Sequence, residues 1–217
     1  MPEQYQGPEG DANGSENGHL EDVSNGYQTF SGADWALEEV TGVRYEDCAF
    51  HDVDWSEARL TGCVFTHCTF GNARFNAATL DRVAILQSTL ERCNFFDATL
   101  AGCKLTGSQF VDCGLRPLTV DGGDWGFVAL RGQNLTGAKL GGLRLREADL
   151  TGANLTRVDL RAADLSNARL KDVVLKGADL RGADLDGVEL RGVDLTGAKI
   201  DLAQAGLFAR AYGAIIS

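Results

Sequence analysis

A large apolar residue recurs at every fifth position of this chain, and this period restricts the possible folds more than any other feature. From Phe30 to Ile200, every residue whose number is a multiple of five is large and apolar, which makes 35 consecutive matches. Two residues before each of these centres lies a second series of mainly small side chains, such as Ala33, Cys48 and Ala148. The other three positions are mostly polar, charged or glycine.

A period of five fits neither an α-helix nor an ordinary strand. The buried face of a helix repeats about every 3.6 residues and that of a strand about every 2.0, so either would turn many of these centres toward solvent. A square coil fits, because one pentapeptide forms each side and four sides complete a turn of 20 residues. Stacked at the strand spacing of about 4.8 Å, roughly nine coils would make a rod about 40 Å long. The sequence therefore predicts an all-β fold, a four-sided parallel β-helix.

The limits of the period divide the chain into three segments. Residues 1–26 contain six acidic residues and no Lys or Arg, which predicts a disordered acidic tail, either an interaction arm or a solubilising segment. Residues 27–200 form the predicted rod. In residues 201–217, Asp201 and Gln204 resemble a helix-capping box, so we expect a short C-terminal helix that covers the last coil.

The C-terminal segment also contains apolar side chains that a partner could cover. Four lie in a helical stripe, and two more follow Gly213 near the end of the chain. Besides simple capping, a symmetric homodimer through this end is therefore a second interpretation. The candidate interface residues are Leu207, Phe208, Ala211, Tyr212, Ile215 and Ile216.

Several residues depart from the repeat inside the predicted rod. Gln133 occupies a small inward position and, if buried, must find hydrogen-bond partners. Leu118 and Leu143 are too large for this position, and Gly123, one coil before Leu143, is expected to leave space for it. Pro117 cannot donate a ladder hydrogen bond, so we expect a local kink there.

All six cysteines occupy the small inward position, at residues 48, 63, 68, 93, 103 and 113. Two pairs are 20 residues apart and should stack on neighbouring coils, which suggests a disulfide or a metal site. Their spacing matches no zinc pattern, however, and the compartment is expected to be reducing. We therefore interpret them as reduced thiols that fill the core.

The sequence contains no convergent set of catalytic residues. His51 and His67 fall at outward positions on different sides of the square, where they cannot join a nucleophile and an acid. Gly122, Gly123 and Gly126 are not followed by the Lys-Ser/Thr of a phosphate-binding loop. We therefore expect a protein that is not an enzyme and that uses no cofactor and no metal.

The overall charge limits the possible partners. The formal net charge is -11, which disfavours direct binding to nucleic acid or to an anionic membrane. No stretch approaches the roughly 18 apolar residues of a membrane span, and the N-terminus lacks a secretion signal. We expect a cytoplasmic protein whose partner is basic.

Acidic residues directly precede many of the later centres and form a candidate ridge. The candidate partner-binding residues are Asp149, Asp159, Asp164, Asp179, Asp184, Glu189 and Asp194. With 20 residues per coil, Asp159 stacks under Asp179, and Asp164 stacks under Asp184. Carboxylates repeated about every 4.8 Å resemble a nucleic-acid backbone in spacing and sign. In the alternative interpretation, these side chains satisfy backbone groups at turns.

Segments such as Ala178-Asp-Leu-Arg-Gly182 and Ala183-Asp-Leu-Asp-Gly187 resemble the A(D/N)LXX signature of the pentapeptide repeat family. The resemblance covers residues 28–202 and implies that family's right-handed quadrilateral β-helix. Within the family, Phe110 to Ser217 is similar to the mycobacterial fluoroquinolone-resistance members. Leu115-Arg-Pro-Leu118, which interrupts the repeat, is the most specific part of that similarity.

This closer resemblance implies a dimer joined at the C-terminal ends, a DNA-shaped acidic rod about twice as long as one chain. Such rods bind DNA gyrase in the basic groove that normally holds DNA, and thereby inhibit the enzyme or protect it from fluoroquinolones and natural gyrase poisons. A small GTPase is a partner of some relatives. The alternative hypothesis is a non-catalytic scaffold of the same fold whose partner is unrelated to topoisomerases.

Overall fold

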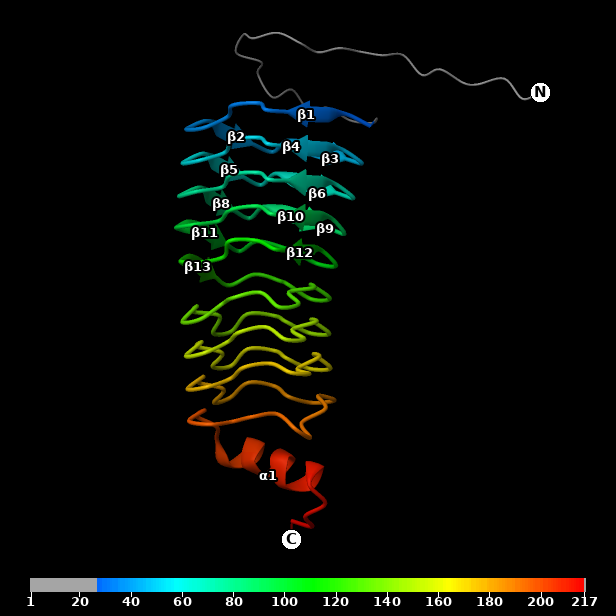
Figure 1. Ribbon diagram of the computed structural model, residues 1–217, viewed down its shortest axis with the longest axis vertical. Coiled ribbons are helices and arrows are strands. Elements are labelled where there is room, and N and C mark those ends of the chain that lie inside the picture. The colour runs from blue at the N-terminus through cyan, green and yellow to red at the C-terminus, as the bar shows by residue number, and fades with distance from the viewer. Residues whose placement is uncertain (1–26, 217) are drawn as a thin grey trace, which may run out of the picture.

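The computed structural model describes residues 27–216, which form an elongated rod of stacked coils closed at one end by a helix (Figure 1). The predicted disordered tail, residues 1–26, lies outside the described residues. The fold is a parallel β-solenoid, as the five-residue period predicts.

Three sides of the rod carry parallel sheets. One has the order β1-β4-β7-β10-β12, the second β13-β11-β8-β5-β2, and the third β3-β6-β9. The bounds are β1 (Thr29–Ser31), β2 (Glu39–Thr41), β3 (Arg44–Glu46), β4 (Ala49–His51), β5 (Arg59–Thr61), β6 (Val64–Thr66), β7 (Thr69–Gly71), β8 (Thr79–Asp81), β9 (Ala84–Leu86), β10 (Thr89–Glu91), β11 (Ala98–Ala101), β12 (Gln109–Val111) and β13 (Leu118–Asp121).

Single bridges form the fourth side, beginning with Asp34↔Asp54 and Asp54↔Arg74. Every strand pair and every bridge joins residues 20 positions apart, as in Phe30↔Phe50. This register confirms a four-sided coil of four pentapeptides.

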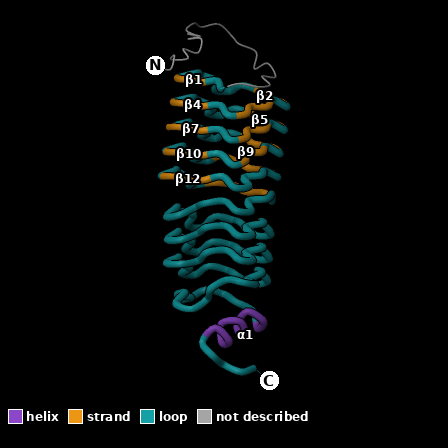
Figure 2. Tube along the Cα trace, turned by 90° about the vertical axis from the view of Figure 1, so that its right-hand side faces the viewer, coloured by secondary structure: helices purple, strands orange, loops and turns teal. Residues whose placement is uncertain are grey.

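Regular strands occupy only the first half of the rod, up to β13 (Figure 2). Beyond it the coils are joined by single bridges such as Asp159↔Asp179, although backbone bonds continue, for example from Leu140 N to Asp159 O at 2.8 Å. In the first half, the residue before the centre is Thr at six positions (29, 69, 79, 89, 99 and 119), and Thr favours strands. From residue 129 to residue 199 this position is never Thr and is Asp or Asn at eight of 15 repeats, and both residues are depleted in strands. This difference accounts for the looser second half.

The fifth-position side chains fill the interior. Leu150, Leu155, Leu160 and Leu165 are at most 1% exposed. In the first half, aromatic rings stack from coil to coil, and the ring centroids of Phe30 and Phe50 are 5.0 Å apart. Other stacked columns continue this arrangement, so aromatic residues fill the first half of the core and leucines fill the second.

Each corner of the coil requires a left-handed backbone. From residue 32 to residue 197, the residue two positions after each centre has a positive φ, as in Gly42 (φ 72°) and Asp47 (φ 55°), at every corner except residue 117. Glycine, Asn and Asp tolerate this conformation best. Pro117 cannot adopt it because its ring holds φ near -65°.

The rod is interrupted next to this proline. No backbone hydrogen bond joins residues 112–122 to residues 132–142 in the described chain. These segments form two adjacent sides that meet at the Pro117 corner. The other two sides of the same junction remain bonded, for example from Phe110 N to Ala129 O and from Trp125 N to Arg144 O. The predicted kink therefore takes the form of an opening in the hydrogen-bond ladder, which we call the Pro117 opening.

The neighbouring departures are also explained by the structure. Gln133 is buried, and its amide nitrogen donates to Phe110 O at 3.3 Å, as expected for a buried amide. Gly123 is required for a reason that the sequence did not indicate. A Cβ there would lie 2.3 Å from Cys103 O, so the backbone of the preceding coil requires glycine at this position.

The helix α1 (Leu202–Ala211) covers the end of the rod and begins with the predicted capping box between Asp201 and Gln204. Gln204 is 3% exposed, and its side chain donates to the carbonyls of Leu180 and Ala183 at 2.5 and 2.9 Å. In the described part of the chain, no helix is long and apolar enough to cross a membrane.

Candidate partner-binding surface

The structure brings four of the seven predicted ridge residues together. The bridges Asp159↔Asp179 and Asp164↔Asp184 place these residues in two neighbouring columns, as the 20-residue register predicts. The other three lie elsewhere. Asp149 and Glu189 fall on a third side and Asp194 on the fourth, so the seven carboxylates do not form one continuous ridge.

Every one of the seven also stabilises its own turn. In each case a side-chain oxygen accepts a hydrogen bond from the backbone N–H two residues later, as from Ser166 to Asp164 at 3.0 Å and from Asp186 to Asp184 at 2.9 Å. The same bond is present at Asp149, Asp159, Asp179, Glu189 and Asp194. These residues therefore have the structural role that the alternative interpretation assigned to them.

Arginines partly neutralise these columns. Arg161 and Arg181 pair with Asp159 and Asp179 across 2.6 Å. These hydrogen bonds lower the pKa of Asp159 and lower that of Asp179 to about 2. The hydroxyl of Ser166 likewise lowers the pKa of Asp164. The carboxylates of Asp159, Asp164 and Asp179 therefore stay ionised at neutral pH, but Asp159 and Asp179 share their charge with a neighbouring guanidinium.

Asp149 is the least accessible of the predicted residues. It is 8% exposed and forms ion pairs with Arg131 at 2.6 Å and with Arg169 at 3.6 Å. A partner would have to displace these arginines to reach its carboxylate. Through these ion pairs, Asp149 joins neighbouring coils.

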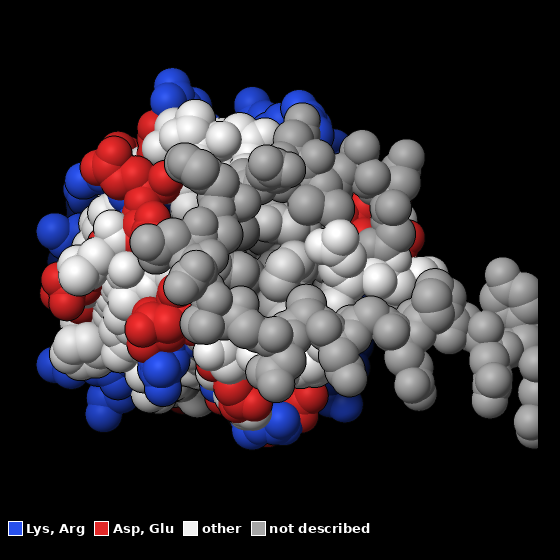
Figure 3. All heavy atoms as spheres, turned by 90° about the horizontal axis from the view of Figure 1, so that it is seen from above, with Lys and Arg blue, Asp and Glu red and all other residues white. Residues whose placement is uncertain are grey.

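The surplus of acidic residues lies in the first coils of the rod. Residues 27–60 contain eight acidic and two basic side chains, whereas residues 81–200 contain 16 of each. Viewed from the N-terminal end, acidic side chains lie at several places around the circumference, interspersed with basic ones (Figure 3). The distribution of charge along the sequence already contains this surplus, but the repeated Asp positions of the later coils do not reveal it.

The six predicted interface residues divide into two groups. Phe208 and Ala211 pack against the core of the rod. Leu207, Tyr212, Ile215 and Ile216 remain exposed, and the exposed fraction of Ile215 is 96%. The structure therefore leaves four of the six available to a second molecule.

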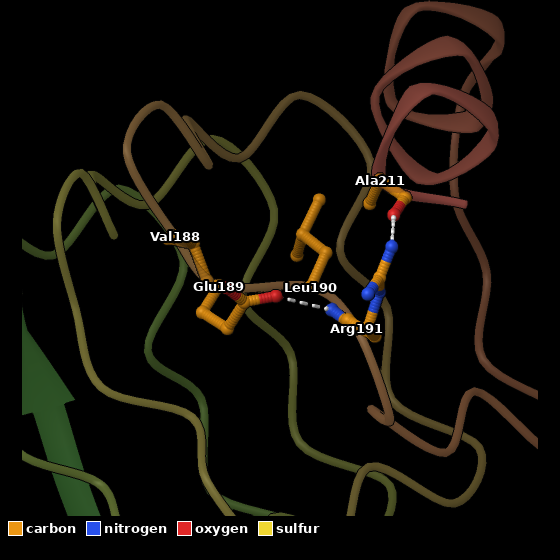
Figure 4. A pocket seen from close by; sticks show the side chains of 5 residues that line it. All are labelled: Val188, Glu189, Leu190, Arg191 and Ala211. Atoms are coloured by element: carbon orange, nitrogen blue, oxygen red, sulfur yellow. Dashed lines mark hydrogen bonds between the residues drawn. The ribbon is translucent and has the colours of Figure 1, made fainter. Parts of the chain in front are cut away.

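A pocket also lies beside α1, at the same end of the rod as the exposed side chains. In the described backbone, the bonds that the repeat would place from Leu170 N to Glu189 O and from Leu175 N to Asp194 O are absent, so the last coil is loosely attached on two sides. A pocket of about 480 Å³ opens there, lined by Val188, Glu189, Leu190, Arg191 and Ala211 (Figure 4). Arg191 reaches across it and donates to Ala211 O at 3.3 Å.

The thiols and imidazoles occupy the positions that the repeat predicts. Five cysteines are buried and Cys113 is partly exposed. His51 belongs to β4, whereas His67 lies on another side and shares a 2.8 Å hydrogen bond with Gln87. The described residues contain no group of three or more His, Cys, Asp or Glu side chains arranged to hold a metal ion.

Comparisons with known proteins agree with this architecture. The model of the family described as pentapeptide repeats matches residues 130–167 and 163–203, and the model described as a pentapeptide repeat region matches residues 38–111. No curated protein shows significant sequence similarity to the chain.

Solved structures show the same fold. A trypsin-treated form of QnrB1, a plasmid-mediated fluoroquinolone resistance protein, is 21% identical and matches with a TM-score of 0.64 over 88% of this chain and 100% of its own. HetL, a pentapeptide repeat protein involved in heterocyst differentiation regulation in the cyanobacterium Nostoc sp. strain PCC 7120, is 21% identical, with a TM-score of 0.55 over 79% of this chain and 85% of its own. With its 20-residue coils, its left-handed corners and two matching family models, the chain belongs to the pentapeptide repeat family.

Proposed function

We propose that this protein is a non-catalytic mimic of DNA that binds DNA gyrase in the cytoplasm. By occupying the basic groove that holds DNA, it modulates or inhibits the enzyme and protects it from fluoroquinolones or natural gyrase poisons. The observation that carries the proposal is the pair of carboxylate columns, Asp159 with Asp179 and Asp164 with Asp184, held at a fixed coil-to-coil register on a rod. The fold shared with QnrB1 supports it.

The proposed mechanism is electrostatic. A groove that binds DNA phosphates attracts carboxylates for the same reason. Because the rod holds its side chains in register, little conformational entropy is lost on binding. The lowered pKa of Asp179 keeps that carboxylate ionised at neutral pH. The acidic first coils, residues 27–60, provide a second contact region of the same sign.

A homodimer through the C-terminal end is part of the proposal. Leu207, Tyr212, Ile215 and Ile216 are exposed, and a second copy that covered them would double the length of the rod. Sedimentation of the full chain tests this step. Ile215→Asp should shift the protein to monomer, whereas Lys171→Glu, an exposed substitution on the side of the rod, should not. A wild-type protein that is monomeric at micromolar concentration would contradict the dimer.

The function is tested by a supercoiling assay with purified gyrase, with and without a fluoroquinolone. We expect the protein to reduce supercoiling or to reduce drug-induced cleavage at micromolar concentration, and the effect should weaken as salt is raised. No change in either readout would eliminate the proposal.

Because these aspartates accept hydrogen bonds at their turns, a variant that tests the role of charge must keep the acceptor oxygen. Asp→Lys would remove a turn acceptor as well as a charge, whereas Asn keeps the acceptor. Asn154 already accepts from Thr156 N at 3.0 Å in this way. The informative variant therefore changes Asp159, Asp164, Asp179 and Asp184 to Asn. Its matched control is Asp194→Asn, which lies on another side. The fourfold variant should lose the effect on gyrase while its circular dichroism spectrum stays the same as that of the control.

The second candidate is a scaffold whose partner is unrelated to topoisomerases. The equal number of acidic and basic side chains in residues 81–200 favours it, because a DNA mimic is expected to be acidic along its length. A pull-down that retrieves another protein, such as a small GTPase, and no gyrase would support this candidate.

A further inference from the structure

Two of the six cysteines, Cys93 and Cys113, lie one coil apart beside the Pro117 opening. They occupy the same inward position of successive coils, and Gly114 N donates to Cys93 O at 2.9 Å. Their thiols point the same way, because Cys93 Sγ donates to Phe70 O at 3.4 Å and Cys113 Sγ donates to Leu90 O at 3.3 Å. The strand spacing of about 4.8 Å falls within the Cα separation that a disulfide spans, about 4.4–6.8 Å. A disulfide between them therefore requires a rotation of the side chains and no change in the spacing of the coils.

Cys113 is the more accessible member of the pair. It is partly exposed, whereas Cys93 is 1% exposed. In the regular repeat, the carbonyl of an inward residue accepts a hydrogen bond from the next coil, as Cys93 O does from Gly114 N. The corresponding bond from Asn134 N to Cys113 O is absent in the described chain. The backbone of Cys113 is thus held from one side only, which gives its side chain access to solvent and freedom to rotate.

The two thiols also differ in acidity. As a hydrogen-bond donor, the thiol of Cys93 lowers the pKa of Cys113, although burial and the carboxylate of Asp112 act in the opposite direction. The same contact raises the pKa of Cys93, and burial adds to this effect. Because the thiolate is the form that attacks an oxidant, Cys113 is the nucleophile of the pair and Cys93 is the second thiol. Thiols that sense oxidants combine a lowered pKa, access to solvent and a neighbouring cysteine.

A second pair of stacked cysteines is closed to solvent. Cys48 and Cys68 are also 20 residues apart, but they are 3% and 1% exposed. The next coil holds Cys68 in place, because Cys68 N donates to Ser88 Oγ and Thr89 N donates to Cys68 O, each at 2.9 Å. Burial raises the pKa of Cys68 to about 11. This pair has the same stacking without the access to solvent, so it serves as an internal control.

We propose that Cys93 and Cys113 are a modification site at which a peroxide forms a reversible disulfide. The Cys113 thiolate attacks one oxygen of hydrogen peroxide, the O–O bond breaks, and the leaving hydroxide takes up a proton to become water. Cys113 is thereby oxidised to a sulfenic acid. The sulfur of Cys93 then attacks the sulfur of Cys113, the S–O bond breaks, and the hydroxyl group leaves as a second water with the proton of Cys93. The two thiols lose two electrons and two protons, and an external thiol such as glutathione reverses the reaction.

This site is independent of the proposed gyrase contact. In a reducing compartment, disulfides of this kind are transient and report the presence of an oxidant. The carboxylate columns begin at Asp159, further along the rod, and both cysteines point inward. The reduced Cys113→Ser variant should therefore give the same result as the wild type in the supercoiling assay. That result separates failure of this inference from failure of the proposed function.

The first test maps the products of oxidation. The reduced full chain is treated with hydrogen peroxide, its remaining thiols are blocked, and proteases that cleave at Lys, Arg and Asp prepare it for mass spectrometry. Asp97 separates Cys93 from Cys103, so the linked cysteines can be identified. We expect a pair of peptides joined through Cys93 and Cys113 that a reducing thiol separates. Cys48 and Cys68 should remain unmodified thiols.

Serine variants separate the roles of the two cysteines. Serine is compatible with this position, because Ser88 and Ser108 are buried at the equivalent inward position of another side. Cys93→Ser should leave Cys113 as a sulfenic acid that dimedone traps, whereas Cys113→Ser should leave Cys93 unmodified. Cys68→Ser is the matched control and should form the disulfide as the wild type does.

Alkylation of the folded, reduced protein by N-ethylmaleimide measures access to each thiol. Cys113 should react at least about tenfold faster than the other five cysteines. Equal rates of alkylation, or formation of a disulfide between Cys48 and Cys68 as fast as between Cys93 and Cys113, would overturn the proposal. A disulfide that joins two chains through Cys113, or oxidation of Cys113 to a sulfinic acid while Cys93 stays reduced, would also overturn it.

Discussion

Two adjacent glycines differ both in backbone conformation and in the space that surrounds them. Gly122 has φ 63°, and a Cβ there would meet nothing within 4 Å. Gly123 has φ 119°, and a Cβ there would lie 2.3 Å from Cys103 O and 3.1 Å from Cys103 N. Since both contacts are backbone atoms of the preceding coil, no side-chain rotation can relieve the clash.

The expected loss of stability follows from these two environments. An L-residue in the left-handed region costs about 1–2 kcal/mol, and alanine recovers about 0.4–1 kcal/mol by restricting the unfolded chain. Gly122→Ala should therefore destabilise the protein by about 1 kcal/mol or less. Gly123→Ala is more strained, because φ 119° lies outside the left-handed region that L-residues adopt, and it must also displace a coil, which costs about 1–3 kcal/mol more. We expect it to destabilise the rod by about 2–4 kcal/mol.

Urea unfolding of both variants, followed by circular dichroism, measures this difference. The slope of each transition must be compared as well as the midpoint, because stacked coils can unfold in more than one step. Equal shifts for the two alanine variants, or a larger shift for Gly122→Ala, would refute the explanation that close approach to Cys103 selects glycine at residue 123.

Three further predictions concern single groups. The amide of Leu115 should exchange with solvent at least about tenfold faster than that of Leu135 in NMR hydrogen-exchange experiments, because only the latter is bonded to the next coil, at 2.9 Å. Trp125→Phe should change the free energy of unfolding by less than about 1 kcal/mol in urea, since the buried indole N–H has no partner, whereas Trp125→Ala should cost about 3–5 kcal/mol. The folded-state pKa of Asp179 is lowered from 3.8 to about 2, so its contribution to stability is present above pH 3.8 and is lost as the pH falls toward 2. Asp179→Asn should therefore reduce the fall in melting temperature between pH 3.8 and pH 2. An unchanged fall would contradict the role given to the Asp179 carboxylate.

The fold could be predicted because the five-residue period of the large apolar side chains determines it. Leu150 and Leu160 are buried because every fifth side chain points into the rod, and the stacking of Asp159 under Asp179 follows from the 20-residue coil. What the side chains do at the surface could not be predicted in this way. Whether an aspartate bonds a turn, pairs with an arginine or faces solvent depends on atoms of neighbouring coils, as the two arginine partners of Asp149 show.

The Pro117 opening marks another limit. Because proline has no backbone N–H, the sequence predicted a local break in the hydrogen-bond ladder. The break in the structure extends over two sides of the rod. Its extent depends on how the chain leaves a corner where a positive φ is impossible, and no repeat pattern contains that information. Gly123 is the same kind of case, because its constraint comes from a carbonyl 20 residues earlier.

The 20-residue register allows length and surface pattern to vary independently. Removing one full coil, for example residues 143–162, would bring segments that already share a side into contact, and every remaining column would keep its neighbours. Removing a single pentapeptide between Asp159 and Asp179 would instead rotate everything beyond it by a quarter turn and place the two carboxylates on different sides. Such a rod can lengthen or shorten by whole coils while it keeps the face that it shows to a partner.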